Sequence, residues 1–237
     1  LRENGEREVR VVGTDMAERS VGRQLCDAFH LIPAGSDPEF ANAMLGVVQE
    51  EGVDEPDLVI ADIARVEPDE VDLVLITNPR GSSGYGEAFC RAIFADWGNK
   101  DYQDVMAGVD HVLSLGFIDE RRLGVGGWSY GGILTNYIIT KNTRFAAAIS
   151  GASEADMFSA FGYDDLQRWW VSELGHPWDQ GELYRKLSPI YDVKKVKTPT
   201  LVMCGEKDFR CPLPQSEQLY LALKTLGKET ALIVYPG

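Results

Sequence analysis

The segment 127–131, with the sequence GWSYG, places the hydroxyl of Ser129 between two glycines. An apolar stretch at 122–126 predicts a strand before it, and 131–140 predicts a helix after it. A sharp strand-to-helix turn raises a serine clear of the sheet, and flanking glycines relieve the crowding there. The pattern predicts that Ser129 is a nucleophile that attacks a carbonyl carbon. A chance glycine-rich turn is the alternative, and the flanking strand and helix argue against it.

The backbone N–H of Tyr130 follows the serine at the expected start of the helix. N–H groups in the first turn of a helix have no acceptor within the helix, so they are available to bind an anion. We therefore predict that the Tyr130 N–H is a donor of an oxyanion hole. The second donor is unassigned.

A serine is a weak nucleophile without a base, and that base needs an acid to orient it. For a serine in this kind of turn, the order along the chain is serine, acid, histidine. Residues 201–208 supply an apolar strand, a turn and acidic side chains. Asp208 is the predicted acid and Glu206 the second candidate. The alternative for Asp208 is an ordinary turn aspartate.

The base should follow the next expected strand, 231–235, but the sequence has no histidine there and ends at Gly237. His30 lies in the first part of the chain and His111 within an amphipathic helix. His176 lies in a polar stretch and is a weak candidate base. We expect that the sequence is truncated just before the histidine, which would leave this chain inactive.

Composition excludes several classes of function. The chain has 237 residues and a net charge of −14, which disfavours nucleic acid and anionic membranes as partners. It has no apolar run of the roughly 20 residues that span a bilayer and no apolar signal core. Its four cysteines fit no common zinc or redox spacing. We expect a cytoplasmic protein with reduced thiols.

Hydrophobic periodicity predicts alternating strands and helices. In the first part, strands are expected at 9–14, 29–32 and 58–61, with helices at 17–27 and 39–51. This βαβαβ order predicts a parallel sheet, followed by a connector at 63–71. After the connector, strands are expected at 73–77, 122–126, 145–149, 200–204 and 231–235, and helices at 101–115, 131–140 and 214–226. A long polar and aromatic excursion occupies 152–188.

Several segments resemble, in order, landmarks of the catalytic domain of the prolyl oligopeptidase family, nearest to its acylaminoacyl-peptidase and dipeptidyl-peptidase-like branch. They are NPRGSSGYG at 78–86, DWG at 96–98, GGWSYGG at 126–132, SPI at 188–190 and GEKD at 205–208. The resemblance covers about residues 72–237. It implies an α/β-hydrolase fold, with a mostly parallel sheet and helices on both faces. It also implies an acyl-serine intermediate, small peptides or acyl-peptides as substrates, and no metal or organic cofactor.

The chain departs from that family in its first part. The family's His-Gly-Gly-Pro loop, which helps to form the oxyanion hole, is absent from 57–71, and the β-propeller that usually precedes this domain is missing. Residues 10–40 are instead similar to the N-terminal domain of carbamoyl-phosphate-synthase-like ATP-grasp proteins. Asp15 follows a strand as a ribose-binding acid would, but no glycine-rich loop precedes it, which favours a turn residue.

We therefore expect two parts, a partial Rossmann-like segment at 1–62 and an incomplete hydrolase domain at 72–237, joined near 55–72. The first part should add nothing to the triad. Two alternatives remain. One is a carboxylesterase on the same scaffold, and the other is a non-catalytic chimeric fragment with a nucleotide-binding-like N-terminal part.

Overall fold

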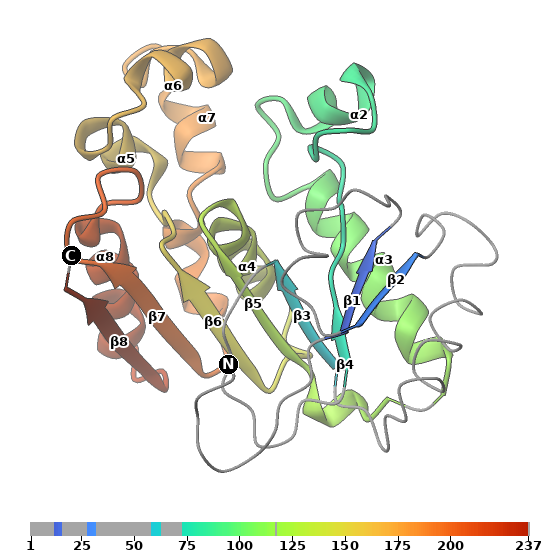
Figure 1. Ribbon diagram of the computed structural model, residues 1–237. Helices are drawn as coiled ribbons and strands as arrows, with labels where there is room; N and C mark the ends of the chain where they lie inside the picture. Colours follow the sequence, from blue (N-terminus) through green and yellow to red (C-terminus); the bar gives the residue numbers. More distant parts are fainter. Residues whose placement is uncertain (1–11, 16–27, 32–57, 63–72, 117, 237) are drawn as a thin grey trace.

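The computed structural model describes residues 12–15, 28–31, 58–62, 73–116 and 118–236 (Figure 1). Its main feature is a parallel sheet with the strand order β4-β3-β5-β6-β7-β8. The strands are β3 (Leu58–Asp62), β4 (Leu73–Leu75), β5 (Gly124–Trp128), β6 (Ala147–Gly151), β7 (Thr200–Gly205) and β8 (Thr230–Tyr235). The predicted α/β fold with a parallel sheet is confirmed.

Helices connect and flank these strands. They are α2 (Glu87–Cys90), α3 (Lys100–Ser114), α4 (Tyr130–Lys141), α5 (Met157–Tyr163), α6 (Gln167–Leu174), α7 (Gly181–Lys186) and α8 (Leu213–Thr225), with short 3₁₀ helices η2 (Arg91–Ile93), η3 (Glu120–Arg122) and η4 (Pro189–Lys195). Helix α4 packs on β5 and β6, and α8 packs on β7 and β8. No helix in these described ranges is long and apolar enough to cross a membrane.

Helix α4 lies in the centre of the core. Ten of its twelve residues are buried, so its sequence is apolar on nearly every side and not only on one face. Its neighbours in the core come from α3 and from the excursion between β6 and β7, where Trp170 and Tyr184 are fully buried. The helix that begins at the candidate nucleophile is therefore fixed by packing on several sides.

The excursion predicted at 152–188 folds into helices α5, α6 and α7. These helices lie beyond the carboxyl ends of β6 and β7 (Figure 1). Because parallel strands end at the same edge of the sheet, the excursion covers the edge at which Ser129 and the loop after β7 emerge.

The first part of the chain differs from the expected arrangement. Strands β1 (Val12–Asp15) and β2 (Ala28–Leu31) form a separate two-stranded parallel sheet. Strand β3, expected beside them, instead pairs with β4 and β5, with Asp62 in register with Gly127. Hydrophobic periodicity predicts that a segment is a strand but not which strand it pairs with. The expected helices at 17–27 and 39–51 and the connector lie outside the described residues, so the domain boundary stays a prediction.

Candidate active site

Ser129 occupies the turn between β5 and α4 with φ 58° and ψ −121°, a conformation that non-glycine residues rarely adopt. Its N–H donates to the carbonyl oxygen of Gly151 at 3.0 Å, and its own carbonyl accepts from Ile133 N–H at 3.0 Å. The residue is exposed. The predicted strand–turn–helix geometry is therefore present, with the serine lifted from the sheet.

Glycines make this turn possible by close backbone contact. A Cβ atom on Gly127 would lie 2.3 Å from the carbonyl carbon of Gly131. A Cβ on Gly132 would lie 2.4 Å from the carbonyl oxygen of Gly151 on β6. The turn thus depends on Gly127, as predicted, and also on Gly132, which the motif alone did not single out. A Cβ on Gly151 would lie 2.4 Å from the Trp128 ring.

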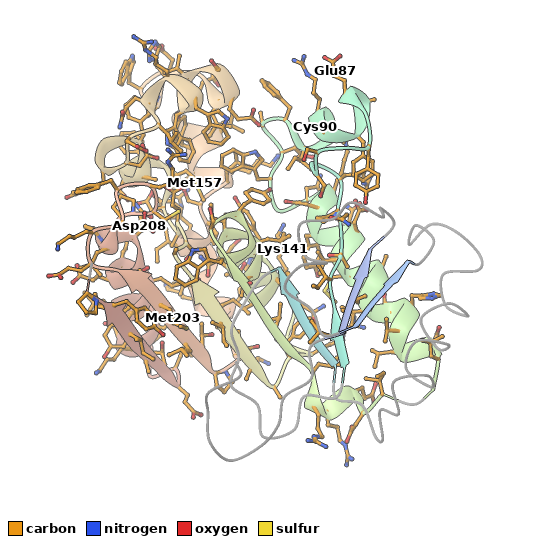
Figure 2. All side chains as sticks on the ribbon, viewed as in Figure 1. Glu87, Cys90, Lys141, Met157, Met203 and Asp208 are labelled. Carbon is orange, nitrogen blue, oxygen red and sulfur yellow. The ribbon has the colours of Figure 1, made fainter. Side chains whose placement is uncertain are left out.

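Asp208 lies in the loop beyond the carboxyl end of β7 (Figure 2), at the same edge of the sheet as Ser129. Its Oδ1 accepts N–H bonds from Arg210 at 2.8 Å and from Cys211 at 2.9 Å. Glu206, the second candidate, is exposed, and its backbone N–H donates to Tyr235 on β8. The position of Asp208 is consistent with that of the predicted acid. Its side chain also stabilises the turn by accepting hydrogen bonds from two backbone N–H groups.

The thiol of Cys211 lies close to the Ser129 hydroxyl, which on its own would lower the pKa of the thiol. Burial, followed by the nearby carboxyl groups of Glu154 and Asp208, raises the pKa of Cys211 to about 12, so the thiol stays protonated. The Cys211 side chain near Ser129 is therefore a neutral thiol, and the Cys211 backbone N–H binds Asp208.

Glu154 is a buried acid beside this cluster that the sequence did not reveal. It follows β6 and is 4% exposed, and its Oε1 has no hydrogen-bond partner among the described residues. Burial, and then the charge and hydrogen bond of Asp164, raise the pKa of Glu154 to about 8. Asp164 in turn accepts from Trp170 Nε1 at 2.5 Å, which ties the acid pair to α6.

The three histidines lie on different segments of the chain. The ring of His176, between α6 and α7, is exposed and stacks on Trp178 with a centroid distance of 4.7 Å. His111 lies in the last turn of α3, and His30 lies in β2. Figure 1 places α3 and β2 toward the opposite side of the sheet from β7.

A cavity of about 460 Å³ opens beside Tyr130, the predicted oxyanion donor. The Tyr130 N–H lies at the first position of α4, as expected. Aromatic side chains form much of the wall, with Trp97 stacked on Trp169 at 5.2 Å. The remaining wall comes from the loop after β4, from α2, η2 and the residue after it, and from α4 and α6: residues 77–82, Cys90, Arg91, Ile93, Phe94, Leu134 and Glu173. The cavity is therefore mainly apolar, with charged groups on its wall.

Within the described ranges, no group of three or more His, Cys, Asp or Glu side chains is arranged to hold a metal ion. The side chains around Ser129 instead suit nucleophilic and general acid–base chemistry. The end of β3 lies beside β5, and residues 63–72, which follow it, lie outside the described residues, so the second oxyanion donor stays unassigned.

The cysteines should differ in their reaction with iodoacetamide. Cys90, on α2 at the periphery (Figure 2), is exposed, whereas Cys204 and Cys211 are buried and burial raises both of their pKa values. Since the thiolate is the reacting species, we expect Cys90 to be alkylated in the folded chain, and Cys204 and Cys211 only after unfolding in urea. Peptide mass spectrometry over time measures each site. Alkylation of Cys211 as fast as Cys90 would contradict its buried, protonated state.

Comparison with known proteins agrees with this geometry. The family model described as "Prolyl oligopeptidase family" matches residues 72–237. An uncharacterized peptidase, YuxL, of Bacillus subtilis is 44% identical over 169 residues, covering 69% of this chain and 25% of that protein. The acylamino-acid-releasing enzyme of Arabidopsis thaliana is 35% identical over 175 residues, covering 69% of this chain and 23% of that protein. The chain thus spans about a quarter of the length of these relatives.

Solved structures give the same result. The acylaminoacyl peptidase of Pyrococcus horikoshii is 32% identical, with a TM-score of 0.68, over 77% of this chain and 33% of that one. An acylaminoacyl peptidase in complex with Z-Gly-Gly-Phe-chloromethyl ketone matches with the same identity and TM-score. The family match begins at residue 72, so the resemblance of the first part to carbamoyl-phosphate-synthase-like proteins stays a prediction.

Proposed function

Because this chain belongs to the prolyl oligopeptidase family, we propose that it carries the nucleophile of a serine peptidase that cleaves peptide or acyl-peptide bonds through an acyl-serine intermediate. The observation that carries the proposal is the strained Ser129 turn, which holds an exposed hydroxyl at the start of α4. Strain of this kind persists only where the surrounding structure imposes it, and it is concentrated at functional sites.

The proposed reaction assigns one role to each group. Ser129 Oγ attacks the carbonyl carbon while a base removes the hydroxyl proton, and the Tyr130 N–H donates to the oxygen that becomes negative. The tetrahedral intermediate then expels the amine, which takes up the proton, and leaves an ester on Ser129. Water hydrolyses the ester by the same steps. Asp208 orients the imidazole base and stabilises its protonated form.

The cavity beside Tyr130 supports a peptide with a large apolar side chain as substrate. Its aromatic wall, with Trp97 and Trp169, would bury such a side chain next to the carbonyl under attack. The chloromethyl ketone in the similar acylaminoacyl peptidase structure is a blocked peptide that ends in phenylalanine. A carboxylesterase would use the same triad, so hydrolysis of matched amide and ester substrates distinguishes the two activities.

The first prediction concerns covalent labelling of Ser129. Because the Cys211 thiol near Ser129 is neutral and no base is assigned in this chain, we expect a fluorophosphonate probe to label it slowly. Added imidazole should accelerate labelling, since it supplies a base. An enzyme that lacks one member of the triad reacts only about 10³–10⁴-fold faster than the uncatalysed reaction in water. Peptide mass spectrometry should place the label on Ser129, and Ser129→Ala should abolish it.

Ser172→Ala is the matched control, because Ser172 is an exposed serine on α6. It should label as the unmodified chain does. Equal labelling of the Ser129→Ala variant, with and without imidazole, would contradict the assignment of the nucleophile. Rapid labelling without imidazole would contradict the absence of a base, and loss of that labelling in His176→Ala would then identify His176 as the base.

A further inference from the structure

The side chain of Tyr130 is tied to a buried carboxylate on a different helix. Its hydroxyl donates to Asp101 Oδ2 at 2.5 Å. Asp101 lies in the first turn of α3 and is fully buried. Burial, and then the charge and hydrogen bond of Asp101, raise the pKa of the Tyr130 phenol, so the phenol remains a donor. The residue that follows the candidate nucleophile is thus held at its backbone and at the tip of its ring.

Asp101 is itself fixed by the backbone at the start of α3. Its Oδ2 accepts from Gly98 N–H at 3.0 Å, and its Oδ1 accepts from Tyr102 N–H at 2.8 Å. These N–H groups lie at the positive end of the α3 dipole, which stabilises the buried charge. Asp101 is therefore a rigid acceptor, because moving it would break three hydrogen bonds together.

The loop before α3 also packs against Tyr130. Trp97 packs edge-on against the Tyr130 ring at 6.0 Å. A Cβ on Gly98 would lie 2.4 Å from the Tyr137 ring, and Lys141 Nζ donates to the Gly98 carbonyl oxygen. The segment 97–101 is thus clamped onto α4 at both ends of that helix.

We propose that Asp101 is a positioning residue that acts through the Tyr130 hydroxyl to aim the Tyr130 N–H at the carbonyl oxygen of the substrate. The inference rests on the proposed function, because it gives that N–H the oxyanion role. The Tyr130 N–H shares one planar peptide unit with the Ser129 carbonyl, which accepts the first intrahelical hydrogen bond, from Ile133. A shift of Tyr130 that loosens this bond therefore also turns the N–H. The ring and the peptide belong to one residue, so fixing the ring limits rotation of the N–H.

Tyr130→Phe and Asp101→Asn test this role. The first removes the donor of the bond, and the second removes the charge and leaves one accepting oxygen where Asp101 uses two. Tyr137→Phe is the matched control: it removes a buried hydroxyl from the same helix, one that donates to the Leu187 carbonyl oxygen. The first measurement is hydrogen exchange of the Ile133 amide by NMR. We expect about a tenfold faster exchange in Tyr130→Phe and Asp101→Asn than in Tyr137→Phe, which corresponds to about 1.4 kcal/mol.

A purely structural role predicts a different pattern of exchange. Asp101→Asn would then loosen the amides of α3, and Ile133 would exchange no faster than in Tyr137→Phe. That result would overturn the proposal. Because exchange needs no reaction at Ser129, this measurement decides the positioning role even if fluorophosphonate labelling fails and the proposed function falls.

The second measurement is the rate of fluorophosphonate labelling at Ser129 in the presence of imidazole. Loss of an oxyanion donor costs about 10²–10³ in rate, so a misdirected donor should cost less. We expect about a tenfold fall in Tyr130→Phe and in Asp101→Asn, no further fall in the double variant, and no change in Tyr137→Phe. Additive losses in the double variant would overturn the proposal, since the two residues would then act independently.

Discussion

Gly127→Ala is expected to lower the free energy of unfolding by about 3 kcal/mol or more. The added methyl group would lie 2.3 Å from the carbonyl carbon and 2.4 Å from the carbonyl oxygen of Gly131. Both are backbone atoms of α4, so relief requires moving the whole helix away from β5. Because α4 is packed on nearly every side, that movement would disturb the core of the sheet. Urea unfolding followed by tryptophan fluorescence measures the change.

Gly162→Ala is the matched control for this substitution. Gly162 lies in α5, and a Cβ built on it would meet nothing within 4 Å. Alanine is better than glycine in a helix by about 1 kcal/mol, so this variant should be as stable as the parent chain or slightly more stable. Equal urea midpoints for Gly127→Ala and Gly162→Ala would show that the turn at Ser129 tolerates a side chain, against the geometry described above.

The second large effect is a fall in stability as pH rises from about 4.5 to about 8. Burial raises the pKa of Glu154 to about 8 from its usual 4.5, so between these values the folded chain keeps a proton that the unfolded chain releases. Stability therefore decreases with pH across this window, by at most about 1.4 kcal/mol per pH unit, and this contribution is constant above it. Urea unfolding at a series of pH values measures the slope.

Glu154→Gln should flatten this slope, because glutamine replaces the protonated acid without titrating. Glu182→Gln is the control, since Glu182 is an exposed acid in the first turn of α7. It also replaces one carboxyl group by an amide but should leave the pH dependence as it is. A slope unchanged in Glu154→Gln would show that Glu154 is ionised in the folded chain across the window.

Local sequence patterns predicted the elements well but not their edges. The strand expected at 122–126 forms at 124–128, because Arg122 belongs to the 3₁₀ helix η3, which Asp119 caps. The helix expected at 131–140 forms at 130–141. The turn at Ser129 was predictable, since glycine spacing and flanking apolar runs are local features.

Contacts across long sequence distances were not predictable in the same way. Glu154 and Asp164 have no motif, and nothing near them in the sequence indicates a buried acid pair. Asp101 follows a family landmark, but its bond to Tyr130 depends on how α3 packs on α4. Likewise, β3 was expected as a strand, whereas its place between β4 and β5 is a matter of tertiary pairing. These features arise from the fold as a whole.

The excursion that carries Trp169 and Glu173 leaves the sheet after β6 and returns at β7, and these two strands are neighbours. The register of β5, β6 and β7 is set by the backbone hydrogen bonds between these strands. It does not depend on the length of the excursion between β6 and β7. Under the proposed function, the nucleophile and one part of the cavity wall thus lie on separate segments of the chain. Replacing residues 157–186 by those of a homologue should therefore change which substrate side chain is preferred. The backbone around Ser129 should keep its conformation.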